Sequence, residues 1–378
     1  MTGYSVQDIF REYGLDYIKT HNLSKEQWKV FNAIRNCKTS ALGTHTITCN
    51  ECHEKHVAFN SCRNRHCPMC QAYAREVWIQ KQNSTLLDCP YFHIVTTIPS
   101  ELNEIFLYNP KICYEILFKA TSQSILELCK DPKWLGAKVG ITSILHTWGQ
   151  TLEFHPHIHS IVTGGGLTAD NKWIECKEDY LIKVQVLSSL FCGKFLAMLK
   201  EEKDLVFPED KQELYDRATF YNFLAPLYEK SWITYIEPPK GSPENVIEYI
   251  GRYSFRVAIS NNRIKDISNG KITFEYKDYK DEDKIKTMVI SADEFIRRFL
   301  LHVLPHKFSK IRHFGLLSNR GKKAIIALCR ILIGTKVNGD FSIFIKRKLK
   351  EFKCPTCGCT SFSYEYKYNC SSRPCAAI

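Results

Sequence analysis

Three histidines within five residues mark the segment with the clearest capacity for chemistry. His155, His157 and His159 alternate through "EFHPHIHSIVTGGG", where β-branched and apolar neighbours favour a strand. Side chains alternate between the two faces of a strand, so the three imidazoles share one face. Pro156 disturbs the start of this strand, which places His155 outside the expected site. The pattern predicts a metal site on His157 and His159, with histidines that serve only packing as the alternative.

The segment before these histidines predicts the neighbouring strand. "KVGITSILHTWGQ" (138–150) has β-branched residues and period two, and a short turn separates it from the histidine strand. An antiparallel hairpin is therefore expected, in which His146, Trp148 and Gln150 share one face. In a suitable register, either Gln150 or His146 joins the two histidines around one ion. Three protein ligands with open positions are typical of a catalytic metal site.

A second set of chemically useful residues lies on a predicted helix. "GSPENVIEYIGRYSFR" contains a serine N-cap followed by proline, so a helix is expected to begin at Pro243. Tyr249 and Tyr253 are four residues apart and share a face of this helix, beside the similarly spaced Arg252 and Arg256. Tyrosines at this spacing are usually packing residues. Their meaning therefore depends on the nearby histidine site.

The seventeen cysteines also require an explanation. In a reducing compartment, clustered cysteines are metal ligands more often than disulfides. Two C-x-x-C knuckles, Cys49/Cys52 and Cys67/Cys70, are separated by fourteen residues, a spacing typical of one closed four-thiolate zinc site. The remaining ligands of this segment predict a second, interleaved zinc site made of Cys37, His45, Cys62 and His66. His53 and His56 are alternative ligands, although surface histidines are the preferred interpretation of these two.

Two further features bear on these zinc sites. Arg63 and Arg65 lie among the knuckles, and a zinc module with arginines is either a DNA-binding or a purely structural element. The C-terminal segment "CPTCGCTSFSYEYKYNCSSRPC" contains five more cysteines and is a candidate for a separate small zinc ribbon.

The length and charge of the chain indicate its domain number and its class of partner. The chain has 378 residues, enough for two or three domains, and a net charge of +12. Residues 302–353 carry nine lysines and four arginines against two acidic residues. Such a block points to nucleic acid as the partner, with a solvated surface as the alternative. No apolar run reaches the ~18 residues of a membrane span, and no signal peptide is visible, so a soluble, cytoplasmic protein is expected.

Together these segments resemble a known family. "HPHIH" is similar to the His-hydrophobic-His motif of the HUH endonuclease superfamily, and "YIGRY" to the tyrosine helix of its two-tyrosine members. With "NSCRNRHCPMCQ" and "LHTWGQTLEFHPHIH", they resemble the rolling-circle transposases of bacterial insertion sequences, over about residues 37–317. Each motif alone is weak, and their combination is specific.

The resemblance implies a mechanism. His157 and His159 would hold a divalent ion, Mg²⁺ or Mn²⁺, against the scissile phosphate of single-stranded DNA. Tyr249 and Tyr253 would be the nucleophiles, giving a covalent 5′-phosphotyrosine and a free 3′-OH, without a nucleotide cofactor.

The third metal ligand is expected from a neighbouring strand or from the tyrosine helix, because related enzymes take it from there. Gln150 is the first choice and His146 the second. Arg252 and Arg256 would help to stabilise the phenolate as it forms.

The implied fold is α+β: an antiparallel sheet flanked by helices, of the HUH endonuclease type, with an N-terminal zinc-knuckle domain and a basic, mostly helical C-terminal region. The expected divisions are a zinc-binding DNA-recognition domain, a tyrosine endonuclease domain, a basic region and a candidate zinc ribbon, at residues 1–86, 87–262, 263–350 and 351–378.

The expected function is that of a nucleoid-associated bacterial transposase that nicks and rejoins single-stranded DNA and binds transposon ends. A plasmid replication initiator or conjugative relaxase of the same superfamily is the alternative within this chemistry. A non-enzymatic zinc DNA-binding protein would leave the coincidence of the histidine pair with the tyrosine pair unexplained. A zinc hydrolase would use the histidines with water and need neither tyrosine.

Overall fold

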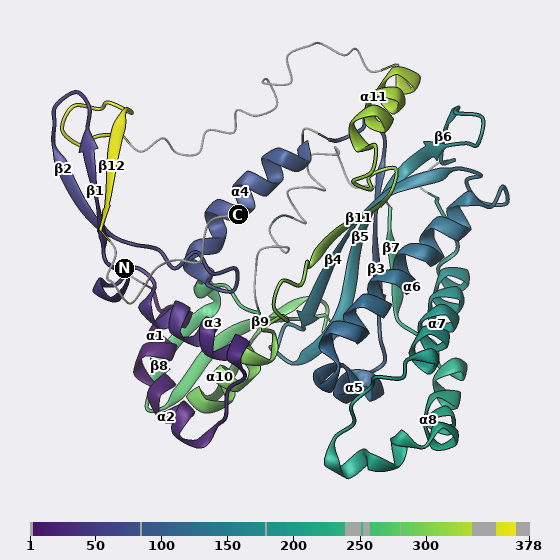
Figure 1. Ribbon diagram of the computed structural model, residues 1–378, viewed down its shortest axis with the longest axis horizontal. Helices are drawn as coiled ribbons and strands as arrows, with labels where there is room; N and C mark the ends of the chain where they lie inside the picture. Colours follow the sequence, from purple (N-terminus) through teal and green to yellow (C-terminus); the bar gives the residue numbers. More distant parts are fainter. Residues whose placement is uncertain are drawn as a thin grey trace.

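A six-stranded antiparallel sheet forms the centre of the molecule (Figure 1). The computed structural model describes residues 3–83, 85–177, 180–238, 251, 258–279, 281–334 and 353–367. The main path of the sheet is β11-β4-β5-β3-β7, and β6 pairs with the end of β5. The strands are β3 (Tyr91–Thr97), β4 (Lys138–Trp148), β5 (Phe154–Leu167), β6 (Trp173–Glu175), β7 (Thr234–Glu237) and β11 (Ile311–Gly315). The antiparallel hairpin expected from residues 138–166 is confirmed as β4–β5.

The glycine run at the end of β5 lets two other segments approach its backbone. A Cβ on Gly165 would lie 2.4 Å from the Trp173 ring on β6. One on Gly166 would lie 2.5 Å from the carbonyl oxygen of Lys138 on β4. Side chains at these positions would therefore force β4 and β6 away from β5.

Helices cover one face of this sheet (Figure 1). Leu145 of β4 and Ile158 of β5 point into a core that also contains Phe106, Phe118 and Phe195. Burying these large apolar side chains away from water is the main stabilisation of this layer. The covering helices are α5 (Asn103–Tyr108), α6 (Pro110–Lys130), α7 (Val184–Glu201) and α8 (Arg217–Glu229).

The opposite face of the sheet carries the histidines. Ile144 of β4 and Ile161 of β5 lie on this face and share a hydrophobic cluster with Ile79 and Ile326. Ile79 belongs to α4 (Pro68–Asn83) and Ile326 to α11 (Lys322–Ile333), so both helices contribute to the packing on this face. The alternation of the strands thus separates a helix-covered face from a face where apolar and histidine side chains mix.

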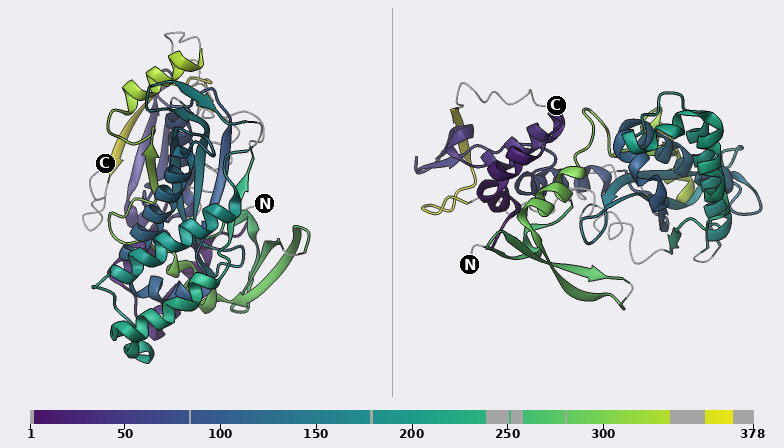
Figure 2. Two further views of the ribbon diagram at one scale, coloured as in Figure 1. Left: turned by 90° about the vertical axis from the view of Figure 1, so that its right-hand side faces the viewer. Right: turned by 90° about the horizontal axis from the view of Figure 1, so that it is seen from below.

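A second body combines both halves of the chain. Phe10 packs on Phe31 and Phe299 with ring centroids 5.7 and 5.3 Å apart, and Phe274 and Phe295 belong to the same core. Its β8–β10 sheet projects away from the central sheet in both views of Figure 2. The elements are α1 (Val6–Glu12), α2 (Gly14–Thr20), α3 (Lys25–Asn36), β8 (Ile264–Ser268), β9 (Lys271–Asp278), β10 (Lys284–Ser291) and α10 (Ala292–Leu301).

A small sheet joins the N-terminal and C-terminal segments. Its order is β12-β1-β2, with β1 (Thr44–Cys49), β2 (Lys55–Phe59) and β12 (Phe362–Lys367). Figure 1 shows this three-stranded ribbon apart from the central sheet, with α4 running between the two. Short 3-10 helices complete the described chain at Ser40–Leu42, Ser100–Leu102, Glu209–Tyr215 and Asn261–Arg263.

The packing crosses the domain boundaries expected from the sequence. Residues 264–301 pack on the N-terminal helices, β11 pairs with β4, and β12 pairs with β1 rather than forming a ribbon of its own. Within its described residues, the region expected to be mostly helical contains four strands, β8 to β11, besides α10 and α11. Its strands have period-two apolar residues that the high charge of the segment obscured. In the part of the chain that the structure describes, no helix is long and apolar enough to cross a membrane.

Candidate metal centres

The antiparallel register brings three histidines together on the sheet. His146 of β4 pairs directly with His157 of β5, and His159 lies two residues further along β5 on the same face. The ligand atoms of His146, His157 and His159 all lie within 4.8 Å of one another. The histidine pair expected from alternation is thus joined by His146, the second choice for the third ligand.

Gln150, the first choice, does not join this group. It lies in the turn after β4, where its Nε2 donates a hydrogen bond to the Tyr279 hydroxyl at 3.0 Å. Its backbone oxygen accepts from Arg263. A register shift between His146 and Trp148 interrupts the regular pairing before Gln150, so the alternation drawn from the sequence does not extend that far. The geometry therefore favours His146.

The contacts of the histidines favour one set of tautomers. His157 Nδ1 lies 2.6 Å from the backbone oxygen of His155, which only accepts, so Nδ1 donates and Nε2 keeps its lone pair. His159 Nδ1 lies 2.8 Å from His93 Nε2, and His93 Nδ1 lies 3.2 Å from a carboxylate oxygen of Glu237. With Glu237 accepting, each imidazole donates in turn, and His159 also keeps its Nε2 lone pair.

These two lone pairs face each other. The Nε2 atoms of His157 and His159 are 3.0 Å apart. With neither nitrogen protonated, this approach is repulsive unless a cation lies against both. Adjacent ligands of an octahedral divalent ion, each at ~2.1 Å, are roughly 3 Å apart. The donor set therefore fits a divalent ion.

Burial keeps the histidines in the form that binds metals. Burial, with a smaller effect from the nearby His155, lowers the pKa of His157 to about 3. Burial also holds the pKa of His159 well below its usual range, with smaller effects from His146 and His157. Neutral imidazole is the coordinating form.

His93 and Glu237 were not expected from the sequence. His93 lies on β3 and Glu237 on β7, and these strands pair with each other on the far side of β5 from β4. Burial lowers the pKa of His93, while the hydrogen bond to Glu237 raises it. The signal was present as the lone histidine of "YFHIVTT", but only the strand order shows which strand it neighbours.

Of the segment that carries the two tyrosines, the structure describes only Gly251. Tyr249, Tyr253, Arg252 and Arg256 lie outside the described residues, and Gly251 between them is described. A Cβ on Gly251 would lie 2.5 Å from Cγ1 of Ile79 on α4. Ile79 belongs to the hydrophobic cluster on the histidine face, so the chain at Gly251 reaches that side of the sheet.

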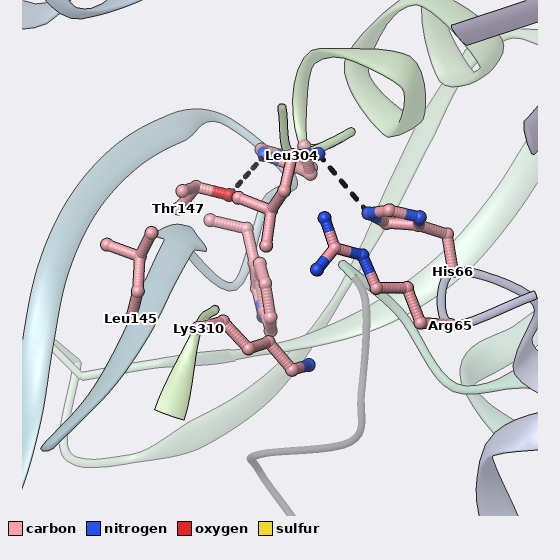
Figure 3. A pocket seen from close by; sticks show the side chains of 8 residues that line it. Arg65, His66, Leu145, Thr147, Leu304 and Lys310 are labelled. Carbon is pink, nitrogen blue, oxygen red and sulfur yellow. Dashed lines mark hydrogen bonds between the residues drawn. The ribbon is translucent and has the colours of Figure 1, made fainter. Parts of the chain in front are cut away.

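Two other residues expected in a site, Arg65 and His66, line a small cavity near the histidine strands. Figure 3 shows Arg65 and His66 on one side of it and Leu145 and Thr147 on the other. His66, expected as a zinc ligand, instead accepts the backbone N–H of Leu304 at 3.2 Å, and burial lowers its pKa to about 3. Arg65 donates to the backbone oxygens of Pro305 and Phe308. Both residues thus contact the segment after α10. Arg63 and Arg65 are both exposed, and His66 is buried.

The cysteines form two clusters that differ from the expected grouping. One consists of Cys37, Cys62, Cys67 and Cys70, and the other of Cys49, Cys52, Cys354 and Cys357. The two N-terminal knuckles therefore do not share a site, because the β1–β2 hairpin carries the first of them away from α4. His45 also stands apart from the cysteines, with its Nδ1 3.0 Å from the Asn60 side-chain oxygen and its ring stacked on Tyr366.

The first cluster has the geometry of a four-thiolate site. Cys37 ends α3, while Cys67 precedes α4 and Cys70 lies in its first turn. The Sγ atom of Cys70 lies 3.5 Å from that of Cys37 and 3.6 Å from that of Cys62. Tetrahedral zinc with Zn–S bonds of ~2.3 Å holds its sulfurs at nearly this separation. Hydrogen bonds from Cys37 and Cys62 lower the pKa of Cys70, while the hydrogen bonds among the four thiols raise the pKa of Cys62 and Cys67, so the sulfur geometry rather than any one pKa supports the site.

Comparisons with known proteins relate the chain to transposases. Residues 140–324 match the family model described as "Putative transposase", and residues 9–98 match the one described as "Transposase zinc-binding domain". The chain is also similar to a solved conjugative relaxase, TrwC in complex with OriT DNA, at 10% identity. That match covers 43% of this chain and 71% of the other, with a TM-score of 0.25, too low to define a shared fold.

Two curated relatives match over most of the chain. "Putative transposase y4qJ" of Sinorhizobium fredii (strain NBRC 101917 / NGR234) is 46% identical over 89% of this chain and 86% of its own length. "Transposase for insertion sequence element IS801" of Pseudomonas savastanoi pv. phaseolicola is 30% identical over 75% of this chain and 68% of its own length. The chain therefore belongs to the insertion-sequence transposases of the IS91 and IS801 type, with their zinc-binding domain in its N-terminal part.

Proposed function

We propose that this transposase cuts and rejoins single-stranded DNA by attack of a tyrosine hydroxyl on a phosphodiester held at His146, His157 and His159. The observation that carries the proposal is the convergence of these three histidines on one face of the sheet. The position of Gly251, between Tyr249 and Tyr253, on the same side of the sheet supports it.

The reaction exchanges one phosphodiester bond for another. The tyrosine oxygen bonds to phosphorus and loses its proton, and the bond from phosphorus to the 3′ oxygen breaks. The leaving oxygen takes up a proton as a free 3′-OH, and the 5′ phosphate stays on the tyrosine. A second 3′-OH reverses the step and rejoins DNA, so no nucleotide cofactor is needed. Two tyrosines would allow one to hold an end while the other cuts.

The three histidines would hold a divalent ion, and that ion would orient the phosphate. A divalent ion, Mg²⁺ or Mn²⁺, would supply positive charge against a phosphate oxygen. His157 offers its Nε2 because the His155 carbonyl occupies its Nδ1, and His159 offers its Nε2 because His93 occupies its Nδ1. Hydrogen bonds of this kind set the orientation and basicity of metal-binding imidazoles.

A group of basic side chains beside the histidines supports DNA as the partner. His313 of β11 pairs with Thr142 on the histidine face, and its Nδ1 lies 3.0 Å from the Thr142 hydroxyl. Burial, with smaller effects from the charges of Lys322 and Lys81, lowers the pKa of His313 to about 4. Burial lowers the pKa of Lys322, and the charge of Lys81 contributes a smaller lowering. Phosphates of a bound strand would relieve this mutual repulsion.

The cluster of Cys37, Cys62, Cys67 and Cys70 is proposed as the structural zinc site of the family's zinc-binding domain. It would fasten the end of α3 to the start of α4. Its thiolates saturate a tetrahedral ion, so the proposed role is structural and separate from the histidine centre.

Tyrosine chemistry predicts a covalent adduct. Labelled single-stranded DNA from the ends of the element, incubated with the transposase and Mg²⁺ or Mn²⁺, should give a protein–DNA species on a denaturing gel. The adduct should disappear in the Tyr249→Phe/Tyr253→Phe double variant. Tyr235→Phe is the matched control, because exposed Tyr235 lies on β7 opposite Val95, on the histidine face. Cleavage that persists in the double variant would identify water, or another residue, as the nucleophile.

The His93–His159 hydrogen bond predicts a specific metal defect. His93→Ala should raise the Mn²⁺ concentration for half-maximal cleavage by about 10–100-fold, with much of the rate restored at saturating Mn²⁺. Gln150→Ala is the control and should leave that concentration unchanged, because the Gln150 amide bonds to Tyr279. A raised Mn²⁺ requirement in Gln150→Ala, with none in His93→Ala, would contradict the proposed ligand set.

The basic group predicts a salt effect. Lys81→Ala and Lys322→Ala should each weaken single-stranded DNA binding and reduce the slope of log K against log salt by about 0.7 per lost phosphate contact. Lys172→Ala removes the same charge from an exposed residue that pairs with Asp170, and should leave the slope unchanged. Fluorescence anisotropy over a salt series measures these slopes, and equal slopes in all variants would exclude phosphate contacts at Lys81 and Lys322.

A further inference from the structure

The second cysteine cluster joins two knuckles from opposite ends of the chain. Cys49 is the last residue of β1, Cys52 follows it, and Cys354 and Cys357 precede β12. The Sγ atoms of Cys49 and Cys357 are 3.6 Å apart, and those of Cys52 and Cys354 are 3.5 Å apart. Cys354 and Cys357 lie beyond both segments that match the family models, 9–98 and 140–324.

The two knuckles have the same local form. In the first, the N–H of His53 donates to the Cys49 oxygen at 3.0 Å, and His53 has a φ of 60°. In the second, the N–H of Gly358 donates to the Cys354 oxygen at 2.8 Å, and Gly358 has a φ of 74°. Each C-x-x-C turn thus closes on a left-handed residue directly after its second cysteine. The repeated turn presents two sulfurs from each knuckle toward the other.

The sulfur separations fit a metal and not disulfides. A disulfide has its sulfurs ~2.05 Å apart, whereas tetrahedral zinc holds four sulfurs at ~3.8 Å from one another. Cys359 provides an internal contrast, because it is close in sequence and outside the cluster. Its Sγ instead accepts the backbone N–H of Ser361 at 3.2 Å.

The ribbon also lacks a hydrophobic core of its own. Val57 and Phe59 of β2 are 68% and 49% exposed, and Tyr364 and Tyr366 of β12 are 54% and 45% exposed. A small sheet with so little buried apolar surface is marginal in water. Metal binding is the usual source of stability for such a module, since its binding free energy is also folding free energy.

We propose that Cys49, Cys52, Cys354 and Cys357 form a second zinc site that fastens the C-terminal strand to the N-terminal domain. The site completes the ribbon at the end where Cys49 pairs with Phe362. At the other end, the Asn60 side chain donates to the backbone oxygens of Thr44 and Lys367, which ties β12 to β1 without metal. The zinc therefore closes the sequence between residues 52 and 354 into one loop.

Zinc stoichiometry of the purified full-length protein tests the site. The wild type should bind two zinc ions, one for each cysteine cluster. Cys49→Ser/Cys52→Ser and Cys354→Ser/Cys357→Ser should each lose one ion, and the variant with all four changes should still lose only one. Cys359→Ser is the matched control and should keep both ions. Loss of two ions in the fourfold variant, or none in the Cys354→Ser/Cys357→Ser variant, would overturn the shared site.

A second measurement does not depend on how well the cysteine variants fold. A protease site is introduced between Gly334 and Lys353, and the zinc-loaded protein is cut after purification. The C-terminal fragment should co-elute with the remainder in size-exclusion chromatography and dissociate when a chelator is added. Returning zinc without the chelator should restore co-elution. A fragment that separates while zinc is bound, or that stays bound after both zinc ions are removed, would refute the clamp.

Discussion

Antiparallel pairing of β4, β5 and β3 is the constraint on which the rest of the site depends. Because facing residues of paired strands share one side of a sheet, His146, His157, His159 and His93 all project toward the same face. A shift of one residue in any of these registers would turn one strand's histidines to the helix-covered face. The sheet and its helix layer thus set the geometry of the histidine centre.

The same pairing also determines the protonation of the site. His159 Nδ1 donates to His93, and His93 donates in turn to the carboxylate of Glu237, while the Nε2 atoms of His157 and His159 lie 3.0 Å apart. Burial keeps the imidazoles of His157 and His159 neutral. Two charged imidazoles at this separation would repel each other. The two Nε2 lone pairs are therefore held ready in a fixed orientation, as a metal site requires.

The features that depend on local spacing could be predicted from the sequence. Alternation in "HPHIH" placed His157 and His159 on one face, and the turn before it predicted the β4–β5 hairpin. His93 and Glu237 were missed because their strands become neighbours of β5 only through the order of the whole sheet. The cysteine knuckles were recognised, but spacing does not say which knuckles pair. That pairing depends on β12 lying beside β1, more than 300 residues away in the sequence.

The most direct test of the central claim is the position of the metal. Crystals of the Tyr249→Phe/Tyr253→Phe variant with single-stranded DNA and Mn²⁺ would give the ion's location from its anomalous signal. The account predicts a peak in contact with Nε2 of His157 and of His159, with His146 as the third protein ligand and a phosphate oxygen beside the ion. A peak bound by Gln150 without His146 would correct the ligand set. Manganese bound to DNA away from all three histidines would contradict the account.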